Sequence, residues 1–487
     1  MAPTTLFLLL FTSSLFIPSY TQNLQPQTTD QEAFISVLIF QQGIDFLKNL
    51  LVTKAISSIT PLRLPKIEKV AKIPFLGNVD FVLSNFTIYE IDVLSSFVKP
   101  GDSGITILAS GTTCNLTTSW QYQFYSWLMP VEIADEGRAS VQVEGMQVGL
   151  TLGLVNQNGT LKLSLMDYGC HVEDVNIKLD GGASWLYQGI IDALEGHIGA
   201  AVEDAITEKL GEGILKLDSF LQSLPKDIPV DDNASLNVTF VKDPLLSNSS
   251  IEFDINGLFT GRRKIPVSMN YLKSSQPLVF CPDPSKMLGI SLDEAVFNSA
   301  SALYYNAKFM QWIVDEVPDQ NLLNTARWRF IIPNLYKNYP NDDMDLNISL
   351  SSPPIIRISE SAVDATVYAD LIIDVLKGDE VIPVVCISLD IRGSGEVRIS
   401  GNKLGGSVKL NDFSMSLKWS KIGNLHLYLI QPVMWTIIQT VFIPYANAHL
   451  GQGFPLPIIH GFTLKNVETI FSGSKIAVCG DVEFTDP

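Results

Sequence analysis

The sequence has little charge and few cysteines. Lys, Arg, Asp and Glu make up 17% of the 487 residues, and the formal net charge is −18. Affinity for nucleic acid comes mainly from Lys and Arg that neutralise phosphates, so this acidic chain is not expected to bind nucleic acid. Five cysteines are too few for disulfides to hold a fold of this length together, and at least one cysteine must lack a partner within the chain. The 46% of apolar residues must therefore form a large core.

The sequence also lacks the common catalytic signatures. It contains no Gly-x-Ser-x-Gly nucleophile elbow, no His-Glu-x-x-His zinc motif and no Gly-x4-Gly-Lys phosphate loop. The segment Gly101-Asp-Ser-Gly104 resembles a serine-protease fragment, but no other part of that family is visible, and a surface turn explains the segment better. No two of the five histidines have the spacing of a metal site. We therefore expect no enzymatic activity, no metal and no cofactor.

The first residues have the pattern of an export signal. Thr5 to Ile17 is an uncharged apolar run, and the first charged side chain is Asp30. The small residues Ser19 and Thr21 precede a plausible cleavage point before Gln22. The run is too short to span a bilayer core of roughly 30 Å. These features predict a signal peptide at residues 1–21, with a buried N-terminal helix as the alternative.

Seven Asn-x-Ser/Thr sequons support passage through the secretory pathway. A secreted protein carries its glycans on surface loops, so the sequons predict a glycoprotein. The acceptors are Asn85, Asn115, Asn158, Asn233, Asn237, Asn248 and Asn347.

Four stretches have the apolar periodicity of long helices: 31–57, 183–224, 292–317 and 425–450. The last contains Pro432 and Pro444, which predict kinks or ends. No Asp, Glu, Lys or Arg lies between Lys421 and Lys465, so this stretch could also be read as a transmembrane segment. The prolines and the strand-like sequence after them favour a buried helix.

Alternating apolar residues between these helices predict strands, and the plan of helix, strands and helix occurs twice. The fold class expected is therefore α+β. We expect an N-terminal unit at 22–225, a linker and central-sheet segment at 226–280, and a C-terminal unit at 281–487.

Several motifs resemble a known family. They are Leu288-Gly-Ile-Ser-Leu leading into Phe297-Asn-Ser-Ala, Gly453-Phe-Pro-Leu-Pro457, Ser184-Trp-Leu186 and Gln222-Ser-Leu-Pro225. Across about residues 30 to 485 the chain resembles the bactericidal/permeability-increasing and lipopolysaccharide-binding proteins, especially their plant members. The resemblance implies an elongated boomerang of two similar barrels, each a twisted antiparallel sheet with long helices, joined by a central sheet.

The resemblance also implies a function. Family members bind lipopolysaccharide, phospholipid or neutral lipid in apolar tunnels, at a membrane or bacterial surface, and some serve innate immunity and the defence response. Burying an acyl chain contributes about 0.8 kcal/mol per CH₂, so such tunnels can hold lipid tails. The alternatives are a phospholipid carrier without an immune role, a structural glycoprotein and a lipid esterase. The missing nucleophile elbow argues against the esterase. No protein partner can be named.

The family resemblance implies residues that line the lipid tunnels and a pair of cysteines that form a disulfide. The tunnels should be lined by residues of the long helices, with a solid core as the alternative. Cys170 matches one partner of the family's disulfide, whose usual second partner is absent, and Cys114 is the expected replacement, with two free thiols as the alternative. The expected tunnel residues are Phe34, Leu38, Ile190 and Leu194 in the first barrel and Phe297, Leu303 and Ile437 in the second.

The resemblance places a hairpin at the tip of the first barrel, where animal members carry lysines. This hairpin has no cation but many aromatic side chains, which favour a bilayer interface. We expect it to contact lipid, helped by the only basic cluster nearby, Lys66, Lys69 and Lys72. Alternation places Trp120, Tyr122 and Phe124 on one face and Tyr125 and Trp127 on the other. One face can pack on the barrel and the other should be exposed, with burial of both faces as the alternative. The hairpin residues are Trp120, Tyr122, Phe124, Tyr125, Trp127 and Leu128.

Overall fold

The computed structural model describes residues 32–73, 77–125, 132–180, 184–261, 281–283, 285–317 and 320–485. At positions 71, 73, 125, 180, 184–190, 192, 193, 320 and 321 it describes the backbone alone. The chain divides into Met1–Glu32 and a compact unit, Ala33–Pro487, which holds the described helices and strands. The signal peptide predicted for residues 1–21 lies outside the described residues.

The first large sheet is antiparallel and has the order β2-β4-β5-β6-β7, with β3 added to β4 and β8 added to β6. Register shifts between Ser84 and Thr87 and between Thr112 and Cys114 interrupt the ladders, and such bulges bend strands. The helix α3 (Ser184–Gln222) packs along β7 and β8 and also contacts β3. We call this assembly the N-terminal barrel. Its strands are β2 (Leu62–Arg63), β3 (Ile67–Ile73), β4 (Gly77–Gly101), β5 (Gly104–Tyr125), β6 (Glu132–Gln157), β7 (Thr160–His171) and β8 (Asp174–Asp180).

The second large sheet repeats this plan in the order β15-β16-β18-β19-β20-β21, with β17 paired to β18. A helix of three parts lies against it: α6 (Leu427–Ile437), the π-helical turn η3 (Ile438–Phe442) and α7 (Ile443–Leu450). We call this assembly the C-terminal barrel. Its strands are β15 (Gln311–Val314), β16 (Asp343–Leu350), β17 (Ile355–Ile358), β18 (Val363–Lys377), β19 (Glu380–Ser400), β20 (Lys403–Ser420) and β21 (Phe454–Pro455), and η1 (Gln320–Leu323), η2 (Thr325–Trp328) and α5 (Pro333–Asn338) lie between β15 and β16.

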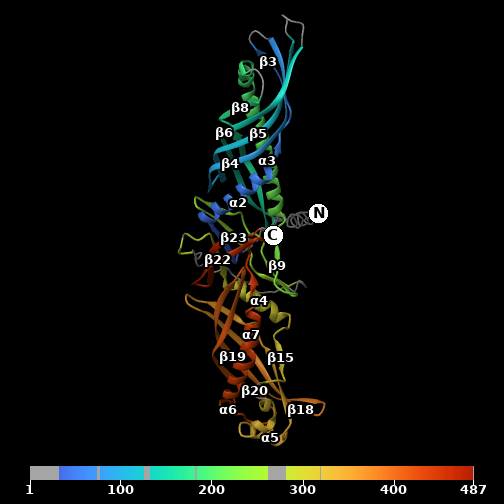
Figure 1. Cartoon of the computed structure of the whole chain (residues 1–487). Coiled ribbons are helices and arrows are strands. Elements are labelled where there is room, and N and C mark those ends of the chain that lie inside the picture. The colour runs from blue at the N-terminus through green and yellow to red at the C-terminus, as the bar shows by residue number, and fades with distance from the viewer. Residues whose placement is uncertain are drawn as a thin grey trace, which may run out of the picture. The chain divides into compact units, whose positions relative to one another are not determined.

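A central sheet takes strands from distant parts of the chain, in the order β11-β12-β1-β14-β23-β22. In Figure 1 its strands β22 and β23 lie between the two barrels, close to the helices α2 (Gln41–Ile59) and α4 (Glu294–Asn306). A small sheet, β13-β10-β9, accompanies it. The remaining strands are β1 (Ile35–Phe40), β9 (Asp227–Pro229), β10 (Ala234–Asn237), β11 (Leu245–Ser247), β12 (Ser250–Ile255), β13 (Phe259–Gly261), β14 (Leu288–Asp293), β22 (Phe462–Ser472) and β23 (Lys475–Phe484).

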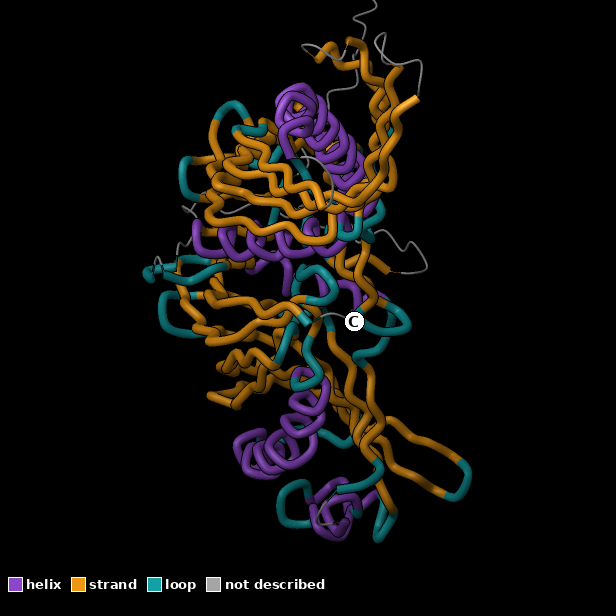
Figure 2. The backbone as a smooth tube through the Cα atoms, turned by 45° about the horizontal axis from the view of Figure 1, so that its top comes forward, coloured by secondary structure: helices purple, strands orange, loops and turns teal. Residues whose placement is uncertain are grey.

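Three large apolar cores support this arrangement. One fills the N-terminal barrel and one fills the C-terminal barrel. The third is built around the central sheet and includes Val98 from β4, Ile290 from β14 and Leu404 from β20. Because this core takes side chains from both barrels, the central sheet joins them. Figure 2 shows strands forming most of the unit, with helices laid along them.

The structure confirms the predicted helix at 183–224, which is α3, and corrects two others. Residues Ile35–Phe40 form β1 instead of the first turns of a helix, because both faces of this strand are covered and all its residues except Ser36 are apolar. The helix expected at 292–317 ends at Asn306, and β15 comes after it.

The helix predicted at 425–450 is present and continues through both prolines. Pro432 lies inside α6, Pro444 lies in the first turn of α7, and the π-helical turn separates the two. Among the described residues, Leu427–Leu450 is a helical stretch long and apolar enough to cross a membrane by those criteria alone. In the structure its parts α6 and α7 contact β20, and Ile430, Met434, Ile437 and Ile438 are buried in the core of the C-terminal barrel.

Candidate lipid-binding site

A ladder of stacked aromatic rings lies inside the N-terminal barrel. Trp120, Tyr122 and Phe124 alternate along β5 and therefore share one face, with ring centroids 5.9 Å and 6.4 Å apart. Phe81 of β4 stacks on Tyr122 at 6.3 Å. The indole Nε1 of Trp120 donates a hydrogen bond to the carbonyl oxygen of Arg138, so its one polar group is satisfied. The barrel wall is thus strongly apolar and aromatic.

Helix α3 closes this interior with a regular stripe. Leu194, Ile198, Val202 and Ile206 recur every fourth residue, and all four are buried in the same core as the aromatic ladder. Such spacing places side chains on one face of a helix. The interior of the N-terminal barrel is therefore bounded by β4, β5 and β6 on one side and by α3 on the other.

The C-terminal barrel has an equivalent interior. Ile430, Met434 and Ile437 of the α6 helix pack in one core with alternating residues of β18 and β19, such as Leu371 and Val385. Trp328 is also fully buried there, and its Nε1 donates to the carbonyl oxygen of Leu322. Both barrels thus bring an uncharged helix face onto an apolar sheet.

One of the two faces of the hairpin predicted to contact lipid packs in the barrel core. Trp120, Tyr122 and Phe124 are only 2%, 5% and 4% exposed, so they face the core and cannot form a surface patch. The alternating pattern along β5 correctly predicted that these three side chains share one face of the strand, and in the structure this face points into the barrel core. The side chain of Tyr125, and residues Trp127 and Leu128 altogether, lie outside the described residues.

The residues predicted to line tunnels are distributed over three cores. Leu194 lies in the N-terminal core and Ile437 in the C-terminal core. Phe34 and Leu303 lie in the core of the central sheet, with Phe297 packed against it. Leu38 is buried in β1 of the central sheet. The side chain of Ile190 is outside the described part.

The cysteines correct a second expectation. Cys114 and Cys170 are free thiols, and the disulfide joins Cys281 to Cys479. Cys114 and Cys170 are nonetheless neighbours: burial, reinforced by the Cys170 thiolate, raises the pKa of Cys114 to about 12. Burial, reinforced by Glu203, raises the pKa of Cys170 to about 12 as well. The sequence matched Cys170 to a family position, but nothing local in it indicated a bond between residues as distant as 281 and 479.

All seven sequon asparagines have solvent access. Asn85, Asn158, Asn233 and Asn248 are exposed, and the other three are partly exposed. Asn85 and Asn158 have φ near +55°, a conformation that asparagine tolerates well in turns. Each sequon therefore remains a candidate for glycosylation.

The predicted basic cluster borders a cavity. Lys66, Lys69 and Lys72 are exposed, and Lys66 forms an ion pair of 2.5 Å with Glu68. Lys66 and Lys69 line a cavity of about 380 Å³ between β3 and α3, which we call the β3–α3 groove. Its opposite wall includes His197, Asp204 and Glu208 of α3. Sequence reasoning found the lysines but missed the α3 residues, whose signal is the three consecutive small residues Gly199, Ala200 and Ala201.

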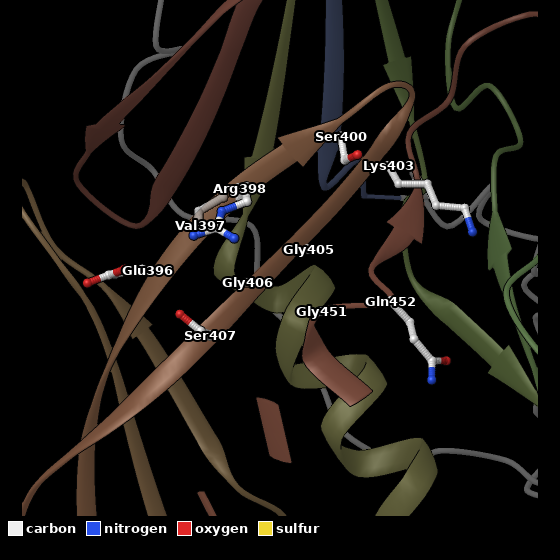
Figure 3. A pocket seen from close by; sticks show the side chains of 10 residues that line it. All are labelled: Glu396, Val397, Arg398, Ser400, Lys403, Gly405, Gly406, Ser407, Gly451 and Gln452. Atoms are coloured by element: carbon white, nitrogen blue, oxygen red, sulfur yellow. The ribbon is translucent and has the colours of Figure 1, made fainter. Parts of the chain in front are cut away.

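A smaller cavity of about 190 Å³ lies beside the hairpin of β19 and β20. Figure 3 shows Arg398, Ser400 and Lys403 on this hairpin, with Gly405 and Gly406 near Gly451. A Cβ atom at Gly405 would lie 3.0 Å from the carbonyl oxygen of Leu450, so glycine is needed where the end of α7 approaches the strand. Among the described residues, no group of three or more His, Cys, Asp or Glu could hold a metal ion.

Comparison with known proteins decides the family. Residues 43–224 match the N-terminal domain model of the LBP/BPI/CETP family, and residues 229–483 match its C-terminal domain model. A BPI/LBP family protein of Arabidopsis thaliana is 63% identical over 481 residues, which cover 99% of this chain and 97% of the relative. The chain belongs to the LBP/BPI/CETP family.

More distant family members share the same extent. The bactericidal permeability-increasing protein of Sebastes schlegelii is 23% identical over 94% of this chain and 97% of its own length. Human lipopolysaccharide-binding protein is 24% identical over 86% of each chain. The crystal structure of a lipopolysaccharide-binding protein covers 94% of this chain and 100% of that chain with a TM-score of 0.68 and 18% identity. The fold that the family resemblance predicted is thus confirmed.

Proposed function

We propose that this protein is secreted and binds lipopolysaccharide or a related amphipathic lipid, holding the acyl chains in the apolar interiors of its two barrels. The observation that carries the proposal is the aromatic ladder of β5 enclosed by the apolar stripe of α3, in a fold shared with a lipopolysaccharide-binding protein. Ligand sites for small molecules are concave and mostly apolar, with few polar groups. The barrels, at residues 22–225 and 281–487, would act as binding units without catalysis.

Secretion has independent support in the Cys281–Cys479 disulfide and the accessible sequons. Disulfides persist in oxidising compartments and are rare where thiols are kept reduced. The disulfide, the sequons and the apolar run at Thr5 to Ile17 all favour export. A role in defence against bacteria would follow if the bound lipid is lipopolysaccharide at a bacterial surface.

The second candidate function is a phospholipid carrier without an immune role. It is favoured by the scarcity of cations in the N-terminal barrel, because residues 1–225 hold 12 Lys and Arg against 23 Asp and Glu. The phosphates of lipid A give it a net negative charge, and phosphate recognition ordinarily uses Lys and Arg. A zwitterionic phospholipid has no net charge and needs fewer cations from the protein.

Mass spectrometry of lipids that co-purify with the secreted full chain tests both. If purified lipid A displaces the bound lipid, the result supports lipopolysaccharide binding. Bound phospholipid that lipid A does not displace supports the carrier, and protein free of lipid that also fails to take up an acyl-chain fluorophore contradicts lipid binding altogether. Turnover of a chromogenic ester would contradict the absence of catalysis.

A further inference from the structure

The outer face of α6 carries no charged side chain. Tyr428, Gln431 and Trp435 are exposed on this face, and the whole helical stretch Leu427–Leu450 contains no Asp, Glu, Lys or Arg. Side chains three and four positions apart lie on one side of a helix. Only 22% of the most apolar part of this stretch is buried in the structure. The helix therefore presents an uncharged and partly aromatic face to the outside of the C-terminal barrel.

Further aromatic rings are exposed where β20 ends and α5 packs. Phe330, which precedes α5, is 77% exposed, Tyr428 is 67% exposed and Trp419 of β20 is 38% exposed. The side-chain amide of Asn334 in α5 donates a hydrogen bond to the carbonyl oxygen of Ile422, which ties α5 to the loop between β20 and α6. The rings thus gather at one end of the C-terminal barrel, where Figure 1 shows α5 and α6.

Four exposed cations lie on the same segments. They are Arg327, Arg329, Lys337 and Lys421. The Cζ atom of Arg329 lies 4.5 Å from the centre of the Phe330 ring, and Nζ of Lys421 lies 5.8 Å from the centre of the Trp419 ring. Within the described ranges, none of the four cations forms an ion pair within 4.0 Å. In a chain whose net charge is −18, this end of the barrel keeps cations that no carboxylate neutralises.

The sequons lie elsewhere in the chain. Asn347 of β16 is the last of the seven, and residues 348–487 contain none. In the order of the sheet, β18 and β19 separate β16 from β20. A glycan is bulky and lies at the surface, so its absence from β20 and α6 leaves this end free to approach a flat surface.

We propose that these exposed rings and cations, which we call the α6 patch, dock on a bilayer surface that contains anionic lipids. Trp and Tyr favour the membrane interface because the ring is apolar and its polar atom can stay hydrated. Lys and Arg are attracted to an anionic leaflet. The patch consists of Phe330, Trp419, Tyr428 and Trp435 with Arg327, Arg329, Lys337 and Lys421.

A bilayer fits the α6 patch better than an acidic protein does. An acidic protein would match the cations, but a helix with an uncharged face and aromatic side chains beside cations is typical of a segment that lies in a membrane interface. The inference goes beyond the function proposed above, because the patch lies on the outside of the barrel and holds no acyl chain in an apolar interior.

Co-sedimentation of the full chain with vesicles tests the docking. The vesicles are phosphatidylcholine alone, or phosphatidylcholine and phosphatidylglycerol in equal parts. The wild type should bind the anionic vesicles about tenfold more tightly or better, since one cation near an anionic surface contributes about fivefold in affinity. High salt should reduce this preference, because it shortens the range of the attraction between exposed charges.

Two double variants separate the contributions of rings and cations. Phe330→Ser/Tyr428→Ser should weaken binding to both kinds of vesicle about tenfold, because less apolar surface is buried in the interface. Arg329→Gln/Lys421→Gln should weaken binding to the anionic vesicles alone, by about tenfold at low salt, and should leave little salt dependence. Circular dichroism shows whether each variant is folded.

Matched controls come from other strands of the same sheet. Ile313→Ser removes a side chain that is 66% exposed on β15, and Arg357→Gln removes an exposed cation on β17. Each should change vesicle binding by less than about twofold. A wild type that binds neither kind of vesicle, unchanged binding in both patch variants, or equal losses in the controls would overturn the α6 patch. Binding of an immobilised acidic protein without vesicle binding would overturn it as well.

A fluorophore on the helix gives a second measurement in which every ring and cation of the patch is kept. An environment-sensitive dye attached at Gln431→Cys should shift its emission to the blue on anionic vesicles, whereas the same dye at Ile313→Cys should not. Vesicle binding without a shift at position 431 would overturn the α6 patch. Uptake of a soluble acyl-chain fluorophore should be the same in Phe330→Ser/Tyr428→Ser as in the wild type. Failure of the wild type to take up this fluorophore would count against the proposed function instead of the patch.

Discussion

The sulfur of Cys281 lies 2.8 Å from the position that a Cβ atom at Gly289 would occupy. Gly289 is also the register partner of Cys479 in the ladder between β14 and β23. The glycine thus leaves the space that the disulfide uses, and the central sheet and its covalent link depend on the same position.

A side chain at position 289 should therefore be destabilising. We expect Gly289→Ala to lower the free energy of unfolding by about 1 to 3 kcal/mol, the usual cost of overpacking a filled core. In a Cys281→Ala/Cys479→Ala background the cost should be smaller, because the sulfur is gone. Urea unfolding of the four proteins gives the coupling, and Gly169→Ala, where no atom lies within 4 Å, is the control. Equal costs in both backgrounds would contradict the steric conflict.

Removing the disulfide should have a larger effect. It closes a loop with a sequence separation of 198, and the chain-entropy model gives about 4 kcal/mol or more for loops this long. We expect Cys281→Ser/Cys479→Ser to lose about this amount in denaturant unfolding. A reducing agent should produce the same loss in the wild type and none in the variant. Equal stability of the reduced and oxidised wild type would contradict this prediction.

Trp120 should behave as a core residue. It is 2% exposed, and its ring fills the space beside Gly137, its partner on β6. Trp120→Ala should cost about 3 to 5 kcal/mol in thermal or urea unfolding, the usual range for deleting a buried aromatic ring. Gln121→Ala, on the exposed outer face of the same strand, should change stability by no more than about 0.5 kcal/mol. A Trp120→Ala protein that keeps its stability but binds membranes more weakly would contradict the core position and indicate that Trp120 lies at the surface.

The thiols of Cys114 and Cys170 should be protonated and slow to react in the native protein. Their pKa values are raised by burial from 9.0 to about 12, and the thiolate is the reactive form. Iodoacetamide at pH 8 should label them slowly in the folded chain, whereas unfolding should expose three alkylatable cysteines and leave two oxidised. Recovery of a Cys114–Cys170 disulfide peptide without reduction would show that the pair is oxidised instead.

The same shifts predict a loss of stability at high pH. A thiol whose pKa is higher in the folded chain than in the unfolded chain favours folding below pH 9, and this contribution falls as pH rises from about 9 toward 12. The difference in urea midpoint between the wild type and Cys114→Ala/Cys170→Ala should therefore change between pH 8 and pH 10.5, with the wild type losing more. Parallel pH profiles would contradict the burial of both thiols.

The sequence predicted the elements whose pattern is regular over many residues. Helix α3 was predicted almost to the residue because Leu194, Ile198 and their successors repeat every fourth position. β1 was misread, because a short apolar run covered on both faces has no periodicity that separates a strand from a helix. Alternation grouped Trp120, Tyr122 and Phe124 correctly, but a strand pattern gives two faces without saying which one is inside.

The candidate site was less predictable because its parts come together only in the fold. Lys69 and Asp204 belong to elements far apart in the sequence, and their proximity depends on α3 lying beside the edge strand β3. Cys281 and Cys479 are likewise neighbours only through the ladder of β14 and β23. The motifs in the sequence were enough to predict the family. Only the three-dimensional structure shows that these residues lie close together.

The strand order of the central sheet has a consequence for biosynthesis. β1 lies between β12 and β14, and β14 in turn requires β23, which is translated long after all of them. The sheet cannot be completed before β23 has been made, so the apolar strands translated earlier lack their full set of partners until then. The N-terminal barrel can form early, but its attachment to the rest must wait for Lys475–Phe484. The early segments therefore expose apolar surface until β23 is available, and they would need protection from aggregation by chaperones during that interval.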